Sequence, residues 1–231
     1  MSSSNLYKDI DPIYLAVDCI IFGFDGNDLK VLLIKRGFKP EKGKWSLMGG
    51  FINKNESVDD GAKRVLLNLT GLGDIFMKQL HVFGEINRDP VARTVSVSYY
   101  ALINIHDYDN KLVREHEARW FTINKIPDLI FDHGEMISKA IESLKKDVKY
   151  SPVRFELLPK KFTLPQLKRL YDCIMGKEHD VRNFSKKILS TGMLIKLNEK
   201  DSNSSKKGAF LYRFDKKRYK TLKDEGFLFI S

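Results

Sequence analysis

The stretch that decides the fold runs from Gly50 to Leu72 and reads Gly-Phe-Ile-Asn-Lys-Asn-Glu-Ser-Val-Asp-Asp-Gly-Ala-Lys-Arg-Val-Leu-Leu-Asn-Leu-Thr-Gly-Leu. Its second half is typical of a helix. Ser57 followed by Asp60 is the pattern of an amino-terminal capping box, and Gly71 suits the left-handed position just past a helix end. Residues 65, 68 and 69 lie about one turn apart, so they share one face of the expected helix.

The same stretch resembles the Nudix box, a phosphohydrolase motif that spaces Gly, Glu and the run Arg-Glu-aliphatic-x-Glu-Glu-x-Gly-aliphatic in the same way. The positions that agree with it are Gly50, Glu56, Arg64, Leu66, Gly71 and Leu72. The family's other three glutamates are replaced here by Val65, Asn68 and Leu69. Glutamates there would give Mg2+ or Mn2+ the oxygen ligands that such ions prefer, and the ion would activate the attacking water. The resemblance therefore implies a Nudix fold, whereas the replacements predict no metal site, no cofactor and no usual hydrolase activity.

Two interpretations stay open for the acids that the box retains. Glu56, Asp59 and Asp60 could hold a metal in an unusual geometry, which would make the chain a Nudix hydrolase. Acids in the first turn of a helix also stabilise its dipole without any metal. The preceding residues favour the Nudix fold in either case, because Lys44–Phe51 resembles the family's Trp-x-Leu-Pro-Gly-Gly segment, with Met48 in place of proline.

The composition is that of a globular chain with one large or two smaller domains. The 231 residues are 42% hydrophobic and 11% aromatic, which is enough for real cores. No apolar run approaches the roughly 20 residues that cross a bilayer, and residues 1–8 lack the apolar segment of a secretion signal. Cys19 and Cys173 lie far apart in apolar segments, which indicates two buried thiols, no disulfide framework and a reducing cytoplasm.

The charge is divided unevenly along the chain. Residues 1–150 contain 21 lysines and arginines and 21 aspartates and glutamates, so their charges cancel. Residues 151–231 contain 19 basic and 9 acidic residues, so the whole excess of +10 lies there. This asymmetry favours a polyanionic partner for the last third alone. We expect two domains, residues 1–150 and residues 151–231.

Strand patterns surround the box helix in the first domain. Apolar segments at 14–22 and 30–36 flank the turn Asp25–Asp28, and further strands are expected at 79–87, 94–105 and 118–121. Residues 133–147 have helical periodicity. Strands, box helix and closing helix together predict a domain of the α/β class, an α+β sandwich of the Nudix kind.

The second domain has the element order of a winged helix. Thr163 caps an expected helix, Leu164–Met175, and Asp180 caps a second one that ends near Ser190. Strands at 193–197 and 209–214 then flank a polar, basic segment. A helix-turn-helix followed by a hairpin with a basic tip predicts a winged helix-turn-helix domain.

The second helix separates its faces as a recognition helix would. Phe184, Ile188 and Leu189 are expected to face the core. The residues left for a DNA groove are Arg182, Asn183, Ser185, Lys186 and Lys187. Arginine can pair with guanine and asparagine with adenine, while lysines suit phosphates. Wing residues expected to follow the DNA backbone are Ser204, Ser205, Lys206 and Lys207. A solvated helix face, or an RNA-binding or interaction module, is the alternative.

A Nudix domain without its glutamates, followed by a winged helix, resembles the NrtR family of Nudix-related bacterial transcriptional regulators. The segments that carry the resemblance include Arg88–Pro90, Phe131–His133, Tyr150–Val153, Phe162–Leu164 and Arg182–Phe184. The resemblance implies a homodimer that binds double-stranded DNA at a palindromic operator and responds to a small effector in the Nudix domain. Members sense ADP-ribose in NAD metabolism or a sugar in pentose catabolism, as does the Nudix-type arabinose regulator AraR.

The missing glutamates favour a neutral sugar, L-arabinose first, because they remove the natural site for a metal-bridged diphosphate. Asp18 interrupts an apolar strand, and a buried carboxylate is costly unless it is paired or functional. The other residues expected to line the cavity are Arg36, Lys44, Trp45, Glu85 and Arg93. Each also has an ordinary explanation as a salt-bridge partner or a core aromatic. The sequence thus predicts a repressor of sugar-utilisation genes that the sugar releases from its operator, with an ADP-ribose-sensing regulator of NAD metabolism as the alternative.

Overall fold

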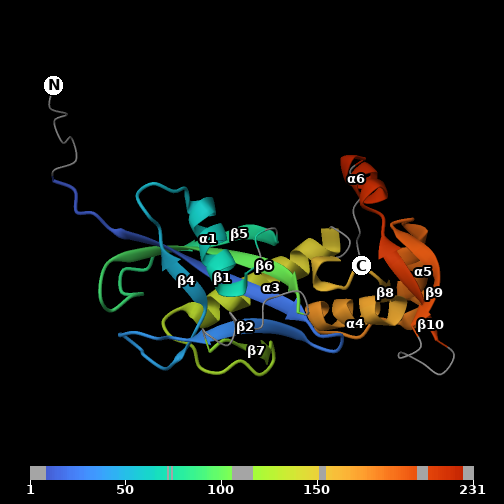
Figure 1. The fold of residues 1–231 in the computed structure, drawn as a ribbon, viewed down its shortest axis with the longest axis horizontal. Coiled ribbons are helices and arrows are strands. Elements are labelled where there is room, and N and C mark those ends of the chain that lie inside the picture. Colours follow the sequence, from blue (N-terminus) through green and yellow to red (C-terminus); the bar gives the residue numbers. More distant parts are fainter. Residues whose placement is uncertain are drawn as a thin grey trace.

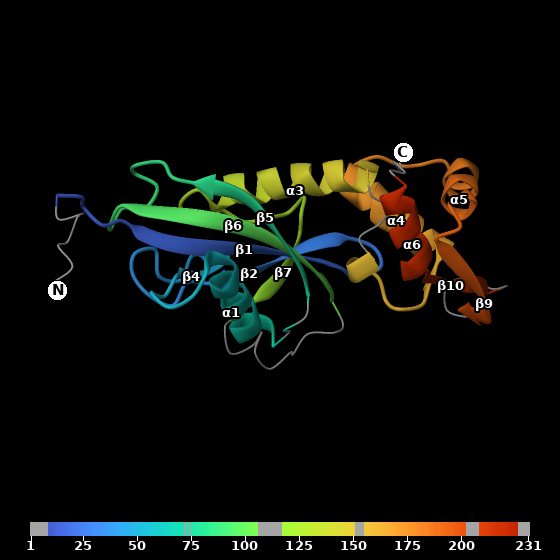
Figure 2. The same ribbon diagram turned by 90° about the horizontal axis from the view of Figure 1, so that it is seen from above.

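The computed structural model describes residues 9–71, 73, 75–105, 117–150, 155–201 and 208–225. The first part of the chain forms a seven-stranded sheet in the order β3-β2-β1-β6-β5, with β4 paired to β1 and β7 to β2 (Figure 1). The strands are β1 (Tyr14–Phe24), β2 (Leu29–Lys35), β3 (Trp45–Ser46), β4 (Met48–Phe51), β5 (Phe76–Phe83), β6 (Thr94–Asn104) and β7 (Arg119–Thr122). Helix α1 (Val58–Thr70) covers one face and helix α3 (His133–Tyr150) the other (Figure 2).

The central strand β1 is buried on both faces from Ala16 to Phe24, which explains why it is apolar there apart from Asp18 and Gly23. It pairs in parallel with β6 along its whole length and antiparallel with β2. Ile20 and Phe22 belong to the core cluster beneath α3, while Cys19 and Ile21 belong to the cluster beneath α1. Because side chains alternate along a strand, the sheet separates two cores. Asp18 lies on the same face as Ile20 and so points toward the α3 side.

Helix α1 begins and ends where the box sequence predicts. The Ser57 hydroxyl accepts a hydrogen bond from the Asp60 backbone nitrogen at 3.1 Å and donates one to the Asp60 carboxylate at 2.8 Å. At the other end Gly71 has a φ of 72°, and its N–H donates to the Leu67 carbonyl. Only glycine adopts such a backbone without a steric cost. The predictions of a Ser57 cap and of a left-handed Gly71 are confirmed, whereas the Asp60 carboxylate bonds the Ser57 hydroxyl and not the backbone N–H that a capping box uses.

The last part of the chain has the predicted winged-helix order. Helices α4 (Leu164–Met175) and α5 (Val181–Ser190) follow the 3-10 turn η1 (Phe155–Leu157), and the three-stranded sheet β8-β10-β9 combines β8 (Phe162–Thr163), β9 (Leu194–Asp201) and β10 (Ala209–Phe214). Thr163 and Gln166 form a capping box at α4, and the Asp180 side chain caps α5. Figure 1 shows α5 and the hairpin at the end of the molecule opposite the amino terminus. The predicted fold class is confirmed.

The core is continuous between the two parts. Leu167 and Tyr171 of α4 belong to the same apolar cluster as Phe22 of the sheet and Leu144 of α3. Arg169 adds a polar contact, since its Nε donates to the Asn27 carbonyl in the β1–β2 turn at 2.7 Å. Helix α3 runs along the sheet and reaches α4 with its carboxyl end (Figure 2). The winged helix is therefore packed directly on the first part of the chain.

Some boundaries and side chains differ from the prediction. The strand predicted at 79–87 is β5, which ends at Phe83, because Ile86 lies in a turn and is 73% exposed. The hairpin strand predicted at 193–197 extends to Asp201, and helix α6 (Lys216–Asp224) was not predicted. Leu189 is 41% exposed rather than in the core, since the cluster takes Phe184 and Ile188 of α5.

Both cysteines are free, and the prediction of two buried thiols is right for Cys19 and wrong for Cys173. Cys19 is buried, and burial raises the pKa of its thiol. Cys173 is only half-buried, against the Asn27 carbonyl at 3.2 Å. Within the described ranges, no helix has the length and apolar character needed to cross a bilayer.

Candidate functional site

The box helix does not gather metal ligands. Val65 is 4% exposed and packs in the core beneath α1, where its Cγ2 lies 3.1 Å from the position of a Cβ atom on Gly50. Asn68 is exposed. Among the residues that the structure describes, no three His, Cys, Asp or Glu side chains are arranged to hold an ion. The residues present thus do not fit the divalent ion that the Nudix fold implies.

The acids that the box retains each have a separate structural partner. The Glu56 carboxylate accepts from Arg64 Nε and Nη2 at 2.9 and 2.6 Å, and these hydrogen bonds hold the pKa of Glu56 at about 2. Arg64 also donates to the Phe51 carbonyl, so it joins the box loop to α1. Asp59 accepts the Tyr99 hydroxyl, and Asp60 belongs to the helix cap.

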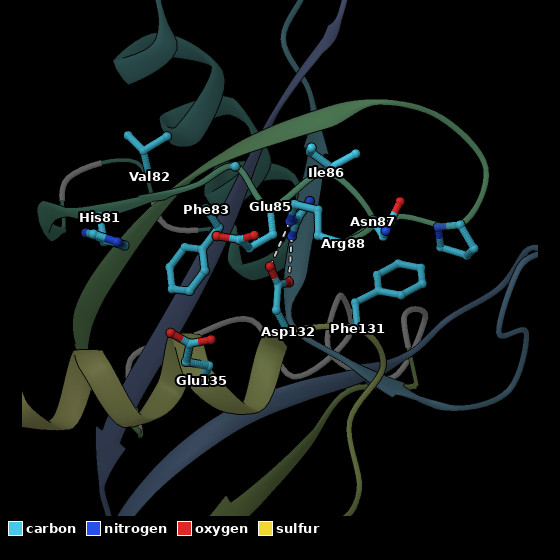
Figure 3. A pocket seen from close by; sticks show the side chains of 12 residues that line it. His81, Val82, Phe83, Glu85, Ile86, Asn87, Arg88, Phe131, Asp132 and Glu135 are labelled. Atoms are coloured by element: carbon cyan, nitrogen blue, oxygen red, sulfur yellow. Dashed lines mark hydrogen bonds and ion pairs between the residues drawn. The ribbon is translucent and has the colours of Figure 1, made fainter.

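A pocket of about 780 Å3 opens between the end of β5 and the start of α3 (Figure 3). Its lining residues are His81, Val82, Phe83, Gly84, Glu85, Ile86, Asn87, Arg88, Pro90, Phe131, Asp132 and Glu135. Figure 3 shows the carboxylates of Glu85 and Asp132 near the Arg88 guanidinium, and the Glu135 carboxylate farther away on α3; the Phe83 and Phe131 rings lie on either side of Asp132 in this view. The wall thus offers hydrogen-bond acceptors, one cation and two aromatic rings, a set that suits a polar organic ligand with hydroxyl groups.

Arg88 and Asp132 form a buried ion pair in this wall. The Arg88 side chain is 4% exposed, and its Nε and Nη2 donate to the two Asp132 carboxylate oxygens at 2.8 and 2.7 Å. Nη2 also lies 3.6 Å from the Asp18 carboxylate, which accepts the Ser96 hydroxyl at 2.6 Å. Asp18 is therefore a paired carboxylate just behind the pocket. A bidentate pair of this kind fixes the geometry of both partners.

His133 completes the network in its neutral form. Its Nδ1 accepts the Leu47 backbone N–H at 3.0 Å, so the ring proton of a neutral imidazole sits on Nε2, which is 3.7 Å from the Asp18 carboxylate. Burial lowers the pKa of His133, although Asp18 opposes that change. Asp132 immediately precedes α3, and His133 is the first residue of that helix. The network thus joins the central strand, the β5–β6 connection and the start of α3.

The structure brings some of the predicted ligand residues to this pocket and separates others from it. Glu85 lines it, and Arg93 Nη1 donates to the Glu85 carbonyl at 3.2 Å. The Arg36 guanidinium stacks on Phe38 at 4.1 Å and lies 5.4 Å from the Phe131 ring. Its Nε is buried and has no hydrogen-bond partner among the described atoms.

Lys44 and Trp45 do not line the pocket. Lys44 is exposed and pairs with Glu41. Trp45 packs against the core through an edge contact with Phe121, at 4.8 Å between ring centroids. These two predicted ligand residues have the structural roles that the sequence left open as alternatives.

The sequence did not single out Arg88, Asp132, Phe83, Phe131 or Glu135 as pocket residues. The sequence did indicate that these regions matter, because Arg88–Pro90 and Phe131–His133 are two of the segments that carry the family resemblance. Their pairing depends on a contact between residues 44 positions apart. A single sequence does not show which distant residues are in contact.

The candidate nucleic-acid interface lies on α5. Arg182, Asn183, Lys186 and Lys187 are exposed and Ser185 is half-buried, while Phe184 is buried against Tyr171 of α4 at 5.1 Å. The wing residues Ser204, Ser205, Lys206 and Lys207 lie outside the described residues. On the hairpin strands next to that segment, Lys196 and Lys200 lie over the Phe210 ring, at 3.6 and 4.9 Å.

The turn between α4 and α5 is fixed by Asp172. One carboxylate oxygen accepts the His179 backbone N–H at 2.9 Å and lies 2.7 Å from its Nδ1. The other accepts Lys168 Nζ at 2.6 Å. These contacts lower the pKa of Asp172 against the opposing effect of burial. The carboxylate therefore sets the angle at which α5 leaves α4.

Comparisons with known proteins identify both parts of the chain. Residues 12–140 match the model of the NUDIX domain, and residues 154–214 match that of the NrtR DNA-binding winged helix domain. The chain is 31% identical to the ADPR responsive transcriptional repressor NtrR of Acinetobacter baylyi, over 90% of this chain and 84% of that one. It is 32% identical to the ADP-ribose pyrophosphatase of Methanocaldococcus jannaschii, over 54% of this chain and 73% of that one.

A solved structure agrees with the full arrangement. Shewanella oneidensis NrtR, crystallised in complex with a 27mer DNA, superposes with a TM-score of 0.79 at 29% identity. The superposition covers 89% of this chain and 95% of that one, so it includes both domains and their packing. The chain belongs to the NrtR family, with a Nudix domain followed by the NrtR winged helix domain.

Proposed function

We propose that this protein is a transcriptional repressor that binds operator DNA through α5 and its wing, and that ADP-ribose in the Nudix domain releases it. The observation that carries the proposal is the similarity to the Acinetobacter repressor, which extends over 90% of this chain and so through sensor and reader together. We keep the division into residues 1–150 and 151–231, and a cytoplasmic location, as parts of the proposal.

The effector proposal departs from the preference for L-arabinose. Both curated relatives described above are named for ADP-ribose, so the arabinose preference gains no support from them. The preference equated the loss of a metal site with the loss of diphosphate binding. Arginines bind phosphates without a metal through charge-assisted, bidentate hydrogen bonds. Arg36 and Arg93 lie beside the pocket between β5 and α3, where they can take that part.

The pocket has groups for the remaining parts of ADP-ribose. Phe131 offers an aromatic face for a base, and the carboxylates of Glu85 and Glu135 can accept ribose hydroxyls. Its volume of about 780 Å3 lies within the range of about 300–1,000 Å3 typical of small-molecule sites. We therefore place the effector in this pocket.

The path from the pocket to the reader follows α3. Asp132 and His133, at its first turn, belong to the pocket network, and Leu144 and Val148, near its other end, share a core with α4. An effector can shift DNA affinity only if it binds two arrangements of the protein with different affinities. A displacement of α3 that moves α4 and α5 would supply two such arrangements.

On DNA we propose that Arg182 and Asn183 read bases and that the lysines of α5 contact phosphates. The amino-terminal residues of a recognition helix meet base edges, and both side chains are exposed there. Two copies bound to a palindrome would place their half-sites about one helical turn, or a multiple of it, apart. Replacing Arg182 by alanine should relax base preference at one position by about 1–3 kcal/mol.

The test combines effector binding with operator release. ADP-ribose should raise the melting temperature of the wild-type protein through mass action, by RT ln(1 + [L]/Kd), and should weaken its binding to the promoter fragment it represses. Glu85→Gln should lower the ADP-ribose affinity. Glu142→Gln, an exposed acid of α3 outside the pocket, is the matched control. Stabilisation by L-arabinose but not by ADP-ribose would refute the effector assignment and leave the DNA assignment standing.

A second candidate function is hydrolysis of ADP-ribose, which the similarity to the Methanocaldococcus pyrophosphatase favours. The geometry argues against it, because Glu56, Asp59 and Asp60 are bound to Arg64, Tyr99 and Ser57. We propose a regulator rather than a hydrolase. Release of AMP from ADP-ribose in the presence of Mg2+, abolished by Glu56→Gln, would reverse that choice.

A further inference from the structure

Helix α6 is a basic element that lies beyond the matched winged-helix domain. The match to the NrtR winged helix domain ends at residue 214, and α6 begins at Lys216. Its sequence, Lys-Lys-Arg-Tyr-Lys-Thr-Leu-Lys-Asp, contains five basic residues and one acidic residue. A basic run of this kind fits either a phosphate contact or a solvated helix. The structure now provides its position.

The helix is docked rather than free. Leu222 is buried, and Tyr219 packs on Phe214 at 5.5 Å between ring centroids. The Asp215 carboxylate accepts the backbone N–H groups of Lys217 and Arg218, at 3.0 and 3.1 Å, and so caps the first turn. Two apolar residues on one face and a cap at the start fix both the direction and the rotation of α6.

Its first turn lies at the carboxyl end of the recognition helix. The Asp215 N–H donates to the Met193 carbonyl at 2.8 Å, three residues after α5 ends. Arg218 Nε lies 3.7 Å from the place that a Cβ atom would take on Gly192. In Figure 1 and Figure 2 alike, α6 lies next to α5 and β10. The start of α6 therefore lies beside the turn that follows α5.

The basic residues of α6 outnumber its acidic residue by five to one. Lys216, Lys217, Arg218 and Lys220 are exposed, and in the described ranges none of them makes an ion pair. Two other lysines of the same domain are paired, Lys161 with Glu199 and Lys168 with Asp172. Four like charges held on one short, fixed helix repel one another, and a polyanion relieves that repulsion.

We propose that α6 is a second DNA-contacting element, which binds the sugar-phosphate backbone beside the major groove that α5 occupies. A recognition helix in the groove has a phosphate chain along each of its sides, and a basic helix at its end meets such a chain. Lysine and arginine are the residues that contact phosphates without reading sequence. The element would extend the bound stretch of DNA and add affinity to every sequence alike. This inference rests on the proposed DNA binding.

The test measures how the affinity for DNA depends on salt. A duplex of mixed sequence and about 30 base pairs, roughly three helical turns, is the probe, and Kd is measured between about 50 and 200 mM salt. Each lost phosphate contact lowers the slope of log K against log salt by about 0.9. The variant Lys217→Gln/Arg218→Gln/Lys220→Gln should lower it by about 2–3. The ratio of operator to mixed-sequence affinity should stay unchanged.

A control separates contact from net charge. Lys42→Gln/Lys54→Gln/Lys125→Gln removes the same charge from exposed positions of the Nudix domain, outside the winged helix, and its salt slope should match that of the wild type. Equal slopes for the α6 variant and the wild type would overturn the proposal, since a merely solvated helix gives that result. Wild-type protein that binds no duplex at all would refute the DNA assignment itself. Thermal melting confirms that each variant is folded.

Discussion

Replacing Asp132 by asparagine removes one charge from the buried network and keeps the side-chain shape. Arg88 is 4% exposed and donates to both Asp132 oxygens, at 2.8 and 2.7 Å. Breaking a buried ion pair costs about 3–5 kcal/mol when the remaining charge is left alone. Here Asp18 stays 3.6 Å from Arg88, and asparagine keeps one acceptor. The loss should therefore approach that of one charged hydrogen bond, about 2 kcal/mol.

The measurement is a double-mutant cycle of Arg88→Met and Asp132→Asn, by chemical and thermal unfolding. For a chain of this size, about 2 kcal/mol corresponds to a fall in Tm of about 4–8 °C. The coupling free energy between the two positions should be about 1–2 kcal/mol, in the range seen for contacting residues. A cycle on the exposed pair Lys63 and Asp60, 3.6 Å apart, serves as the control and should give less than about 0.5 kcal/mol.

A second readout connects the pair to the switch. Asp132 precedes the first turn of α3, so its loss should change how far ADP-ribose weakens operator binding, even where ADP-ribose still binds. Coupling between Arg88 and Asp132 no larger than that of the surface pair would refute the claim that they form one structural unit. An unchanged response to ADP-ribose would refute their part in transmission and leave the stability result intact.

Three further outcomes test other parts of the structure. Val65→Glu should destabilise the fold by several kcal/mol and restore no Mg2+-dependent hydrolysis, because the side chain would enter a core that offers no partner; near-native Tm would contradict the burial. Burial lowers the pKa of His133. The unfolded chain therefore takes up the proton at a higher pH than the folded chain, so the free energy of unfolding should decrease as the pH falls below about 6.5. His133→Gln, which keeps an acceptor for the Leu47 N–H, should flatten that part of a Tm profile against pH. Asp172→Asn should free the His179 turn and weaken operator and mixed-sequence DNA binding together, by about 5-fold or more for a loss of about 1 kcal/mol in held geometry; a selective loss at the operator alone would contradict a positioning role.

Much of the fold follows from local signals in the sequence. The caps at Ser57, Thr163 and Asp180 and the left-handed glycine at Gly71 fix the helix ends through contacts within a few residues. Such interactions are the same in any fold, so a pattern predicts them well. The burial of Ala16–Phe24 on both faces of β1 likewise follows from side chains that do not alternate between apolar and polar.

The misplaced elements depend on contacts between distant residues. Only Tyr219 and Leu222 make α6 amphipathic, and their partner Phe214 belongs to the hairpin. Leu189 was assigned to the core by periodicity, yet the turn after α5 leaves it 41% exposed. Local propensity is a weak guide where docking decides.

The candidate site divides in the same way. The sequence identified Asp18 as a carboxylate that needs a partner, which the structure supplies through Ser96 and Arg88. It placed Trp45 in the cavity, whereas the contact with Phe121 places that ring in the core. A charged residue in an apolar strand indicates that it has a partner, but the identity of that partner depends on the fold.

The box in this protein separates two roles that one motif combines in a hydrolase. The positions that agree with the pattern stabilise the structure here. Glu56 and Arg64 connect the loop before α1 to that helix, and Gly71 ends the helix. Gly50 lies so close to Val65 that any Cβ would press on its side chain. The replaced position 65 would have carried a metal ligand, and it now closes a core. Because the scaffold contacts of the box do not involve a metal, the domain keeps its fold and its pocket without the ion.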